Sequence, residues 1–180
     1  MLIRSKKVWS SSQFLPLTIE VEDNKIVAIY DYNHFDKVDY DFGDERILPG
    51  FIDVHTHGAY GYDTNDVDEE GLRNWTKNVV SEGVTSFLPT TITQTEEVLL
   101  KAVANVAKVY DEGYEGAEIL GIHFEGPYLD EEKRGAQPLS CIQTPSVEQF
   151  KKFQKASNNL IRLITIACEK DADYELTKYL

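Results

Sequence analysis

Residues 48–58, LPGFIDVHTHG, decide the fold of this 180-residue chain. Residues 47–54 form an apolar run, which is typical of a strand buried in a parallel sheet. His55 and His57 follow at its C-terminal end. Because side chains two residues apart on a strand point to the same side, both imidazoles can reach one metal ion. The motif alone leaves open a plainer alternative, a pair of histidines that only ends a strand.

Downstream of this stretch, apolar strands alternate with amphipathic helices. We expect strands over residues 83–89, 117–124 and 160–167. Helices are expected over residues 66–81, after a Thr93/Glu96 capping box, after Ser146, and from about Asp171. Four such units indicate an α/β fold with a parallel sheet covered by helices. An open doubly wound sheet and a (β/α)8 barrel both fit this pattern.

Residues 1–49 have a different sequence pattern from the rest of the chain, and this pattern predicts a small all-β segment. Polar residues 22–25 separate two alternating runs and predict a hairpin over residues 17–30, and a third strand is expected near residues 38–42. We therefore expect two parts, an N-terminal β segment over 1–49 and four strand–helix units over 50–180.

A second candidate motif, His123–Pro127, ends the third strand of the body. His123 and Glu125 are two residues apart and share a face, and a carboxylate is a ligand that Zn, Fe or Mn accepts. Asp53 and His123 are candidates for residues that do not bind the metal themselves but orient a side chain that does. The plainer alternative for Glu125 is a solvated carboxylate. The following loop, with Lys133, Arg134 and residues 135–138, lies on the same side as Glu125, although composition alone favours a solvated surface loop.

Composition excludes several classes of function. The formal net charge is −13, from 31 acidic and 18 basic residues, which argues against nucleic-acid and anionic-membrane partners. No apolar run approaches the ~20 residues of a membrane span, and the N-terminus lacks the apolar stretch of a signal peptide. Two cysteines cannot build a disulfide framework, so we expect a cytoplasmic protein.

The two motifs together resemble a known family. Residues 48–58 are similar to the signature of the amidohydrolase superfamily. Three further stretches point to one family within this superfamily. They are HFEGPYL at 123–129, KRGAQ at 133–137 and GVTSFLPT at 83–90, and they resemble the N-acetylglucosamine-6-phosphate deacetylases. The resemblance covers essentially the whole chain and only the first half of the family's length.

This resemblance implies a fold, a metal site and a substrate. The fold would be the first half of a (β/α)8 TIM-type barrel, preceded by a small β-sandwich segment. Glu125 would bind a divalent metal ion (Zn, Fe or Mn), and His55 and His57 would bind a second ion in two-metal members. Ala136 and Gln137 would contact the amino-sugar phosphate. The reaction would be metal-dependent deacetylation to glucosamine 6-phosphate and acetate.

The resemblance also implies that part of the active site is absent. Two further metal-binding histidines and the general-base aspartate belong to later strands of the family, and no histidine follows His123 here. We therefore expect no catalytic residue in this chain, with the aspartate lying beyond Leu180. The 180-residue polypeptide alone is expected to be inactive and to bind metal poorly.

Two alternatives stay open. Another amidohydrolase, dihydroorotase-like or deaminase-like, would use a carboxylated lysine, for which Lys170 lies just past the fourth strand. A non-catalytic assembly module is the other alternative. Half a barrel would leave open sheet edges and apolar faces, so we expect a homo-oligomer.

Overall fold

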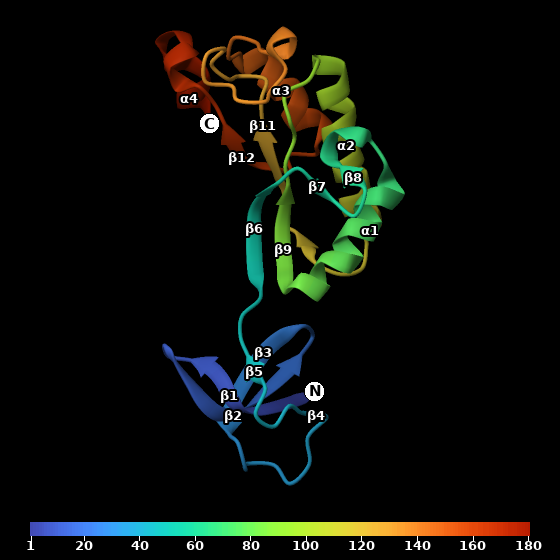
Figure 1. The fold of residues 1–180 in the computed structure, drawn as a ribbon, viewed down its shortest axis with the longest axis vertical. Helices are drawn as coiled ribbons and strands as arrows, with labels where there is room; N and C mark the ends of the chain where they lie inside the picture. The colour runs from blue at the N-terminus through green and yellow to red at the C-terminus, as the bar shows by residue number, and fades with distance from the viewer. The chain divides into compact units, whose positions relative to one another are not determined.

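The computed structural model describes residues 1–180, which form two compact units, Met1–Pro49 and Gly50–Leu180. Figure 1 traces the elements of each unit along the chain. None of the helices combines the length and apolar character that crossing a membrane requires.

Unit 1 is one five-stranded sheet in which β1 is central. Antiparallel pairing joins β1 to β2 and β2 to β3, whereas β4 and β5 pair with β1 in parallel. The strands are β1 (Leu2–Ser10), β2 (Gln13–Glu22), β3 (Lys25–Asp31), β4 (Tyr40–Asp41) and β5 (Arg46–Ile47).

The hairpin predicted for residues 17–30 is confirmed by β2 and β3. Glu22 pairs with Lys25, and the turn residues Asp23 and Asn24 have φ angles of 46° and 61°. Asn and Asp tolerate this left-handed conformation, which a tight hairpin turn requires. Strand β1 is not predicted from the sequence, because its register shifts between Ser5 and Val8 and breaks the alternation of apolar side chains.

Unit 2 is an α/β unit built on parallel strands. Parallel pairing joins β6 to β9, β9 to β10 and β11 to β12, and a parallel bridge between Thr90 and His123 connects the end of β9 to β11. The elements are β6 (Phe51–Thr56), the β7 (Gly58–Ala59) and β8 (Tyr62–Asp63) hairpin, α1 (Glu69–Val79), β9 (Val84–Pro89), α2 (Glu96–Glu112), β10 (Glu118–Ile119), β11 (Ile122–Glu125), α3 (Val147–Ala156), β12 (Ile161–Thr165) and α4 (Glu175–Tyr179). Short 3-10 turns occupy residues 64–66, 80–82, 139–141, 168–170 and 172–174.

The core of unit 2 lies between its strands and helices. Figure 1 shows α1 and α2 on the same side of β6 and β9. The expected apolar helix faces are confirmed, because Trp75 of α1, Leu99 of α2 and Phe153 of α3 are all at most 1% exposed. Trp75 packs against Phe87 of β9, and Phe153 packs against Phe124 of β11, with ring centroids 4.7 and 4.8 Å apart. The first contact joins two consecutive strand–helix units, and all of these residues belong to one hydrophobic cluster.

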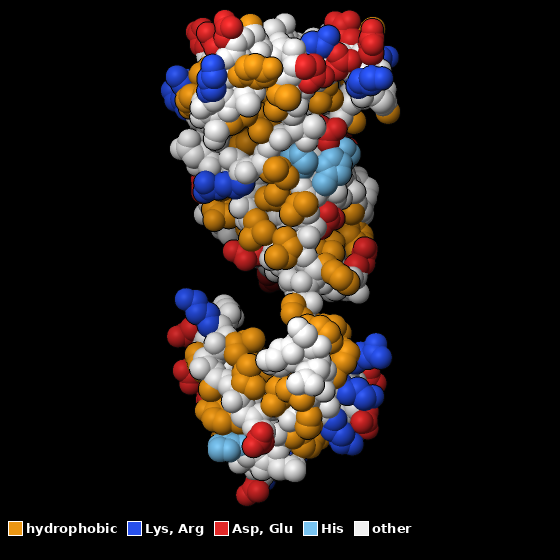
Figure 2. Space-filling view, turned by 90° about the vertical axis from the view of Figure 1, so that its left-hand side faces the viewer, with side chains coloured by type: hydrophobic (Ala, Val, Ile, Leu, Met, Phe, Trp, Pro, Cys, Tyr) orange, Lys and Arg blue, Asp and Glu red, His pale blue; other side chains and the backbone are white.

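Strand β6 is more exposed than its apolar sequence predicts. Phe51, Ile52 and Val54 are 70%, 62% and 50% exposed, so the expectation of a buried strand is wrong for these side chains. The physical reason is that β6 is an edge strand and pairs only with β9. Figure 2 shows many hydrophobic side chains on one face of this unit.

Three element boundaries differ from the expected ones. Thr95, rather than Thr93, caps α2, and its side chain accepts from the N–H of Val98. The third body strand is interrupted at residues 120–121, where Gly121 has a φ of 149°, so β10 and β11 pair with different neighbours. The last helix begins at Glu175, and the Asp171 carboxylate accepts from the N–H groups of residues 176 and 177.

Replacing the N-cap of α1 is expected to destabilise unit 2 moderately. The Asp68 side chain accepts from the N–H of Glu70 at 3.1 Å, and this bond satisfies a donor that the helix leaves free. Asp68→Ala should lower the free energy of unfolding by about 0.5–2 kcal/mol. Urea unfolding followed by fluorescence of the buried Trp75 measures this loss. Glu132→Ala, which removes an exposed carboxylate, is the control, and an equal loss in both variants contradicts the prediction.

Candidate metal centre

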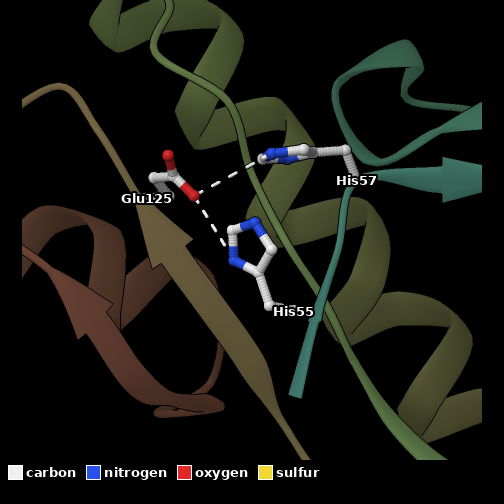
Figure 3. A group of neighbouring side chains, drawn as sticks. All are labelled: His55, His57 and Glu125. Atoms are coloured by element: carbon white, nitrogen blue, oxygen red, sulfur yellow. Dashed lines mark ion pairs between the residues drawn. The ribbon is translucent and has the colours of Figure 1, made fainter. Parts of the chain in front are cut away.

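Two motifs from separate strands meet at one end of the sheet. His55 lies near the C-terminal end of β6 and His57 directly follows that strand, while Glu125 is the last residue of β11. Strand β9 pairs with β6 and is bridged to β11, so these strand ends lie side by side. Figure 3 shows both imidazoles directed toward the Glu125 carboxylate. Catalytic groups of α/β barrels occupy this end of the strands.

The three side chains offer ligand atoms to a common point. Glu125 Oε2 lies 3.4 Å from His55 Nδ1 and 3.9 Å from His57 Nε2. All three atoms lie within 4.8 Å of one another. The Glu125 side chain is 15% exposed and that of His55 is 51% exposed, so the group is reachable from one side. In Figure 2 the histidines of this unit form one surface group.

The tautomer of His57 follows from its partner. His57 Nδ1 lies 3.2 Å from the carbonyl oxygen of Thr90. A carbonyl only accepts, so Nδ1 holds the proton and Nε2 presents a lone pair toward Glu125. Metal-binding histidines commonly donate their second N–H to a backbone carbonyl in this way, which sets the ring orientation.

His123 lies beside this group with both ring nitrogens engaged. Its Nδ1 donates to the carbonyl of Val54 at 2.9 Å, and its Nε2 lies 2.8 Å from the Thr165 hydroxyl. Burial lowers the pKa of His123, which favours the neutral ring. A neutral ring with a protonated Nδ1 accepts from Thr165 at Nε2. His123 therefore keeps no nitrogen free for an ion, and its Nδ1 lies 3.3 Å from His55 Nδ1.

The two carboxylate oxygens of Glu125 have different surroundings. Oε1 accepts from the side-chain amide of Gln137 at 2.6 Å, whereas Oε2 is buried and has no hydrogen-bond partner. A buried acceptor without a donor is costly, and here it faces two imidazole nitrogens. A divalent cation between these atoms removes that cost, and imidazole plus carboxylate suits Zn, Fe or Mn. The residues present therefore fit a metal ion.

Other sequence candidates lie near the site with different contacts. The Asp53 carboxylate accepts from the backbone N–H of His55 at 3.1 Å, which leaves its orienting role a prediction. Ala136 is exposed, while Gln137 is only 7% exposed. Arg134 donates to the carbonyls of Glu131 and Gln137 and so braces its own loop.

Sequence reasoning missed the threonines that hold the site together. Thr91 Oγ1 accepts from the N–H of Glu125 at 3.0 Å and donates to its carbonyl oxygen at 3.1 Å. Thr90 Oγ1 accepts from the N–H of Thr56 at 3.0 Å and so ties β6 to the chain after β9. The only sequence signal was a stretch with three threonines directly after a strand, TTIT at residues 90–93.

Comparison with known proteins identifies similar chains. N-acetylglucosamine-6-phosphate deacetylase of Bacillus subtilis is 41% identical over 140 residues, which are 76% of this chain and 35% of that protein. The protein of the same name from Lysinibacillus sphaericus is 38% identical over 155 residues, which are 86% of this chain and 40% of the relative. The chain thus spans well under half the length of these curated relatives.

Solved structures of the same kind share the fold. An N-acetyl-D-glucosamine-6-phosphate deacetylase mutant from Mycobacterium smegmatis, in complex with N-acetyl-D-glucosamine-6-phosphate, aligns with a TM-score of 0.86 and 25% identity. The alignment covers 96% of this chain and 44% of that one. The Pasteurella multocida deacetylase aligns with a TM-score of 0.80 and 29% identity, over 94% of this chain and 46% of the other. The family model described as "Amidohydrolase family" matches residues 46–170, and on this match the chain belongs to the amidohydrolase family.

Proposed function

We propose that this chain forms the first part of a metal-dependent hydrolase that deacetylates N-acetylglucosamine 6-phosphate. Residues 50–180 supply the first half of its (β/α)8 barrel, and residues 1–49 belong to a small β-sandwich. The observation that carries the proposal is the convergence of His55 Nδ1, His57 Nε2 and the unpartnered Glu125 Oε2. The names of the similar proteins supply the substrate.

His55, His57 and Glu125 would hold the metal ion, at one or two positions per complete site. When bound, such an ion polarises the amide carbonyl and activates water. Hydrolysis breaks the amide C–N bond of the acetamido group, so that the acyl carbon leaves as acetate and the nitrogen as the amine of glucosamine 6-phosphate. The general-base aspartate that takes and returns the proton is proposed to lie beyond Leu180.

The protein's own residues orient the ligand side chains. The Thr90 carbonyl holds the proton of His57 on Nδ1, which leaves Nε2 bare. Thr91 clamps the backbone of Glu125, and Gln137 holds Oε1.

The alternative based on a carboxylated Lys170 receives less support. Lys170 Nζ pairs with Asp130 at 2.8 Å, and this hydrogen bond raises the pKa of the lysine. Carboxylation needs the neutral amine, so this ion pair opposes it. The non-catalytic assembly role and the homo-oligomer stay predictions, which light scattering of the purified chain can test.

Release of acetate from N-acetylglucosamine 6-phosphate tests the proposed function. The whole protein, produced from its complete reading frame, should release acetate at a rate that falls on chelation and returns with added metal. The 180-residue chain alone should show no release above the uncatalysed rate, because it offers three ligand side chains and no histidine after His123. Acetate release by the chain alone at the rate of the whole protein contradicts this expectation.

A further inference from the structure

The side-chain amide of Gln137 links two structural features that are remote in sequence. Its Nε2 donates to Glu125 Oε1 at 2.6 Å, and its Oε1 accepts from the backbone N–H of Thr93 at 2.6 Å. The residue is 7% exposed. Both ends of the amide are therefore engaged within the protein, and the substrate contact expected for Gln137 stays a prediction.

The orientation of the amide is determined by its partners. The Thr93 N–H can only donate, so the oxygen of the Gln137 amide must face it. The NH₂ group is then directed at Glu125, whose Oε1 accepts from it. The backbone N–H of Thr93 thus sets the orientation in which the Gln137 NH₂ group donates to Glu125.

Engagement of one oxygen leaves the other for a ligand role. With Oε1 occupied, Oε2 is the buried acceptor without a donor, and it is the oxygen that lies nearest His55 and His57. Thr91 holds the backbone of Glu125 at both its N–H and its carbonyl, so the remaining freedom of the residue lies in its side-chain torsions. Gln137 restricts those torsions.

The loop that presents Gln137 is braced by its own contacts. The Asp130 carboxylate accepts from the backbone N–H groups of Glu132 and Lys133, at 2.8 and 3.0 Å. The Arg134 guanidinium donates to the carbonyl of Gln137 at 3.0 Å. These contacts fix the loop, so the side-chain amide of Gln137 has a defined position.

We propose that Gln137 is a positioning residue for the metal ligand Glu125: it binds Oε1 and thereby presents Oε2 alone to the ion. The inference rests on the proposed metal-dependent function. Sequence reasoning placed Gln137 against the substrate. The buried, doubly engaged amide adds a role toward the metal ligand, and the substrate contacts of Ala136 and Gln137 stay predictions.

Metal binding to the whole protein tests this role directly. Gln137→Leu removes the donor, and Gln137→Glu keeps an acceptor for the Thr93 N–H while replacing the donor with a carboxylate. Affinity for Zn²⁺, measured by competition with a chromophoric chelator, should fall by about 10–100-fold in Gln137→Leu, the range typical of groups that support a ligand. Gln149→Leu removes an amide that bonds Tyr128 and Glu96, away from Glu125, and should leave the affinity unchanged.

The visible spectrum of the Co²⁺-loaded protein gives a second readout. Freed from Gln137, the Glu125 carboxylate can turn or bind through both oxygens, so the d–d bands should change in both Gln137 variants and not in Gln149→Leu. Circular dichroism identifies any variant that fails to fold, and the other Gln137 variant then decides. Folded Gln137 variants with wild-type Zn²⁺ affinity and Co²⁺ spectrum overturn this inference alone. A wild-type protein that binds metal without deacetylating the sugar overturns the proposed function alone.

Discussion

Glu125→Gln in the whole protein is expected to abolish metal retention and, with it, acetate release. Gln137 donates to the Oε1 position, so the amide oxygen of the variant should occupy that position. Its NH₂ group then lies at the Oε2 position and directs hydrogens, instead of a lone pair, at His55 and His57. The loss of Zn²⁺ affinity should exceed the ~100-fold upper range for residues that only support a ligand.

Metal content after gel filtration, together with acetate release, measures this effect. Glu131→Gln is the matched control, because it removes one carboxylate from the neighbouring exposed loop and should retain the metal. Lys170→Ala distinguishes the carboxylated-lysine alternative, since its Nζ pairs with Asp130 and should be dispensable for metal binding. If Glu125→Gln keeps its full metal content and Lys170→Ala loses the metal, then Lys170 is the essential ligand and Glu125 is not.

Phe124→Ala is expected to have the largest effect on stability. Phe124 lies between His123 and Glu125 in the sequence, and its side chain is fully buried. Its ring packs on Phe153 of α3 with the centroids 4.8 Å apart. Removing a buried phenyl ring costs the transfer free energy of the ring and leaves a cavity. We expect the free energy of unfolding to fall by about 3–5 kcal/mol, a large share of the ~5–15 kcal/mol that stabilises a typical domain.

Urea unfolding of the chain measures this loss. Tyr110→Ala removes an aromatic side chain that is 42% exposed on α2, and it should change the free energy of unfolding by less than about 0.5 kcal/mol. If Phe124→Ala costs no more than this control, the packing of β11 against α3 does not stabilise the unit. Since Phe124 lies next to both motif residues of β11, its loss should also weaken metal binding.

Much of the fold was predictable because it depends on local pattern. The helix faces of Trp75 and Phe153 repeat at helical spacing, and burial of both confirms the prediction. The N-cap of α3 was predicted correctly, since Ser146 accepts from the N–H of Gln149. For α2 the same reasoning selected Thr93, whereas Thr95 caps the helix and the N–H of Thr93 binds Gln137 instead. The Thr93/Glu96 spacing favoured Thr93, whereas the helix begins at Glu96, directly after Thr95.

Burial of the first body strand was not predictable from its composition. Phe51 and Ile52 have the apolar character of an interior strand, and both are more than half exposed. Exposure depends on what lies beside a strand, and β6 has a partner on one edge only. A local apolar pattern does not reveal whether a strand has a partner on both edges or on one.

The sequence by itself indicated the candidate ligands for a metal ion and that they lie at the C-terminal ends of two parallel strands. His55, His57 and Glu125 follow apolar runs, and parallel strands bring their C-terminal ends to one edge. Only the tertiary structure decided the chemical state of each group. The Thr90 carbonyl sets the tautomer of His57, and contacts with Val54 and Thr165 occupy His123. Gln137 separates the roles of the two Glu125 oxygens through bonds that span 12 and 44 residues. Hydrogen bonds form within a few tenths of an ångström, and only the packed fold sets distances between remote segments to that accuracy.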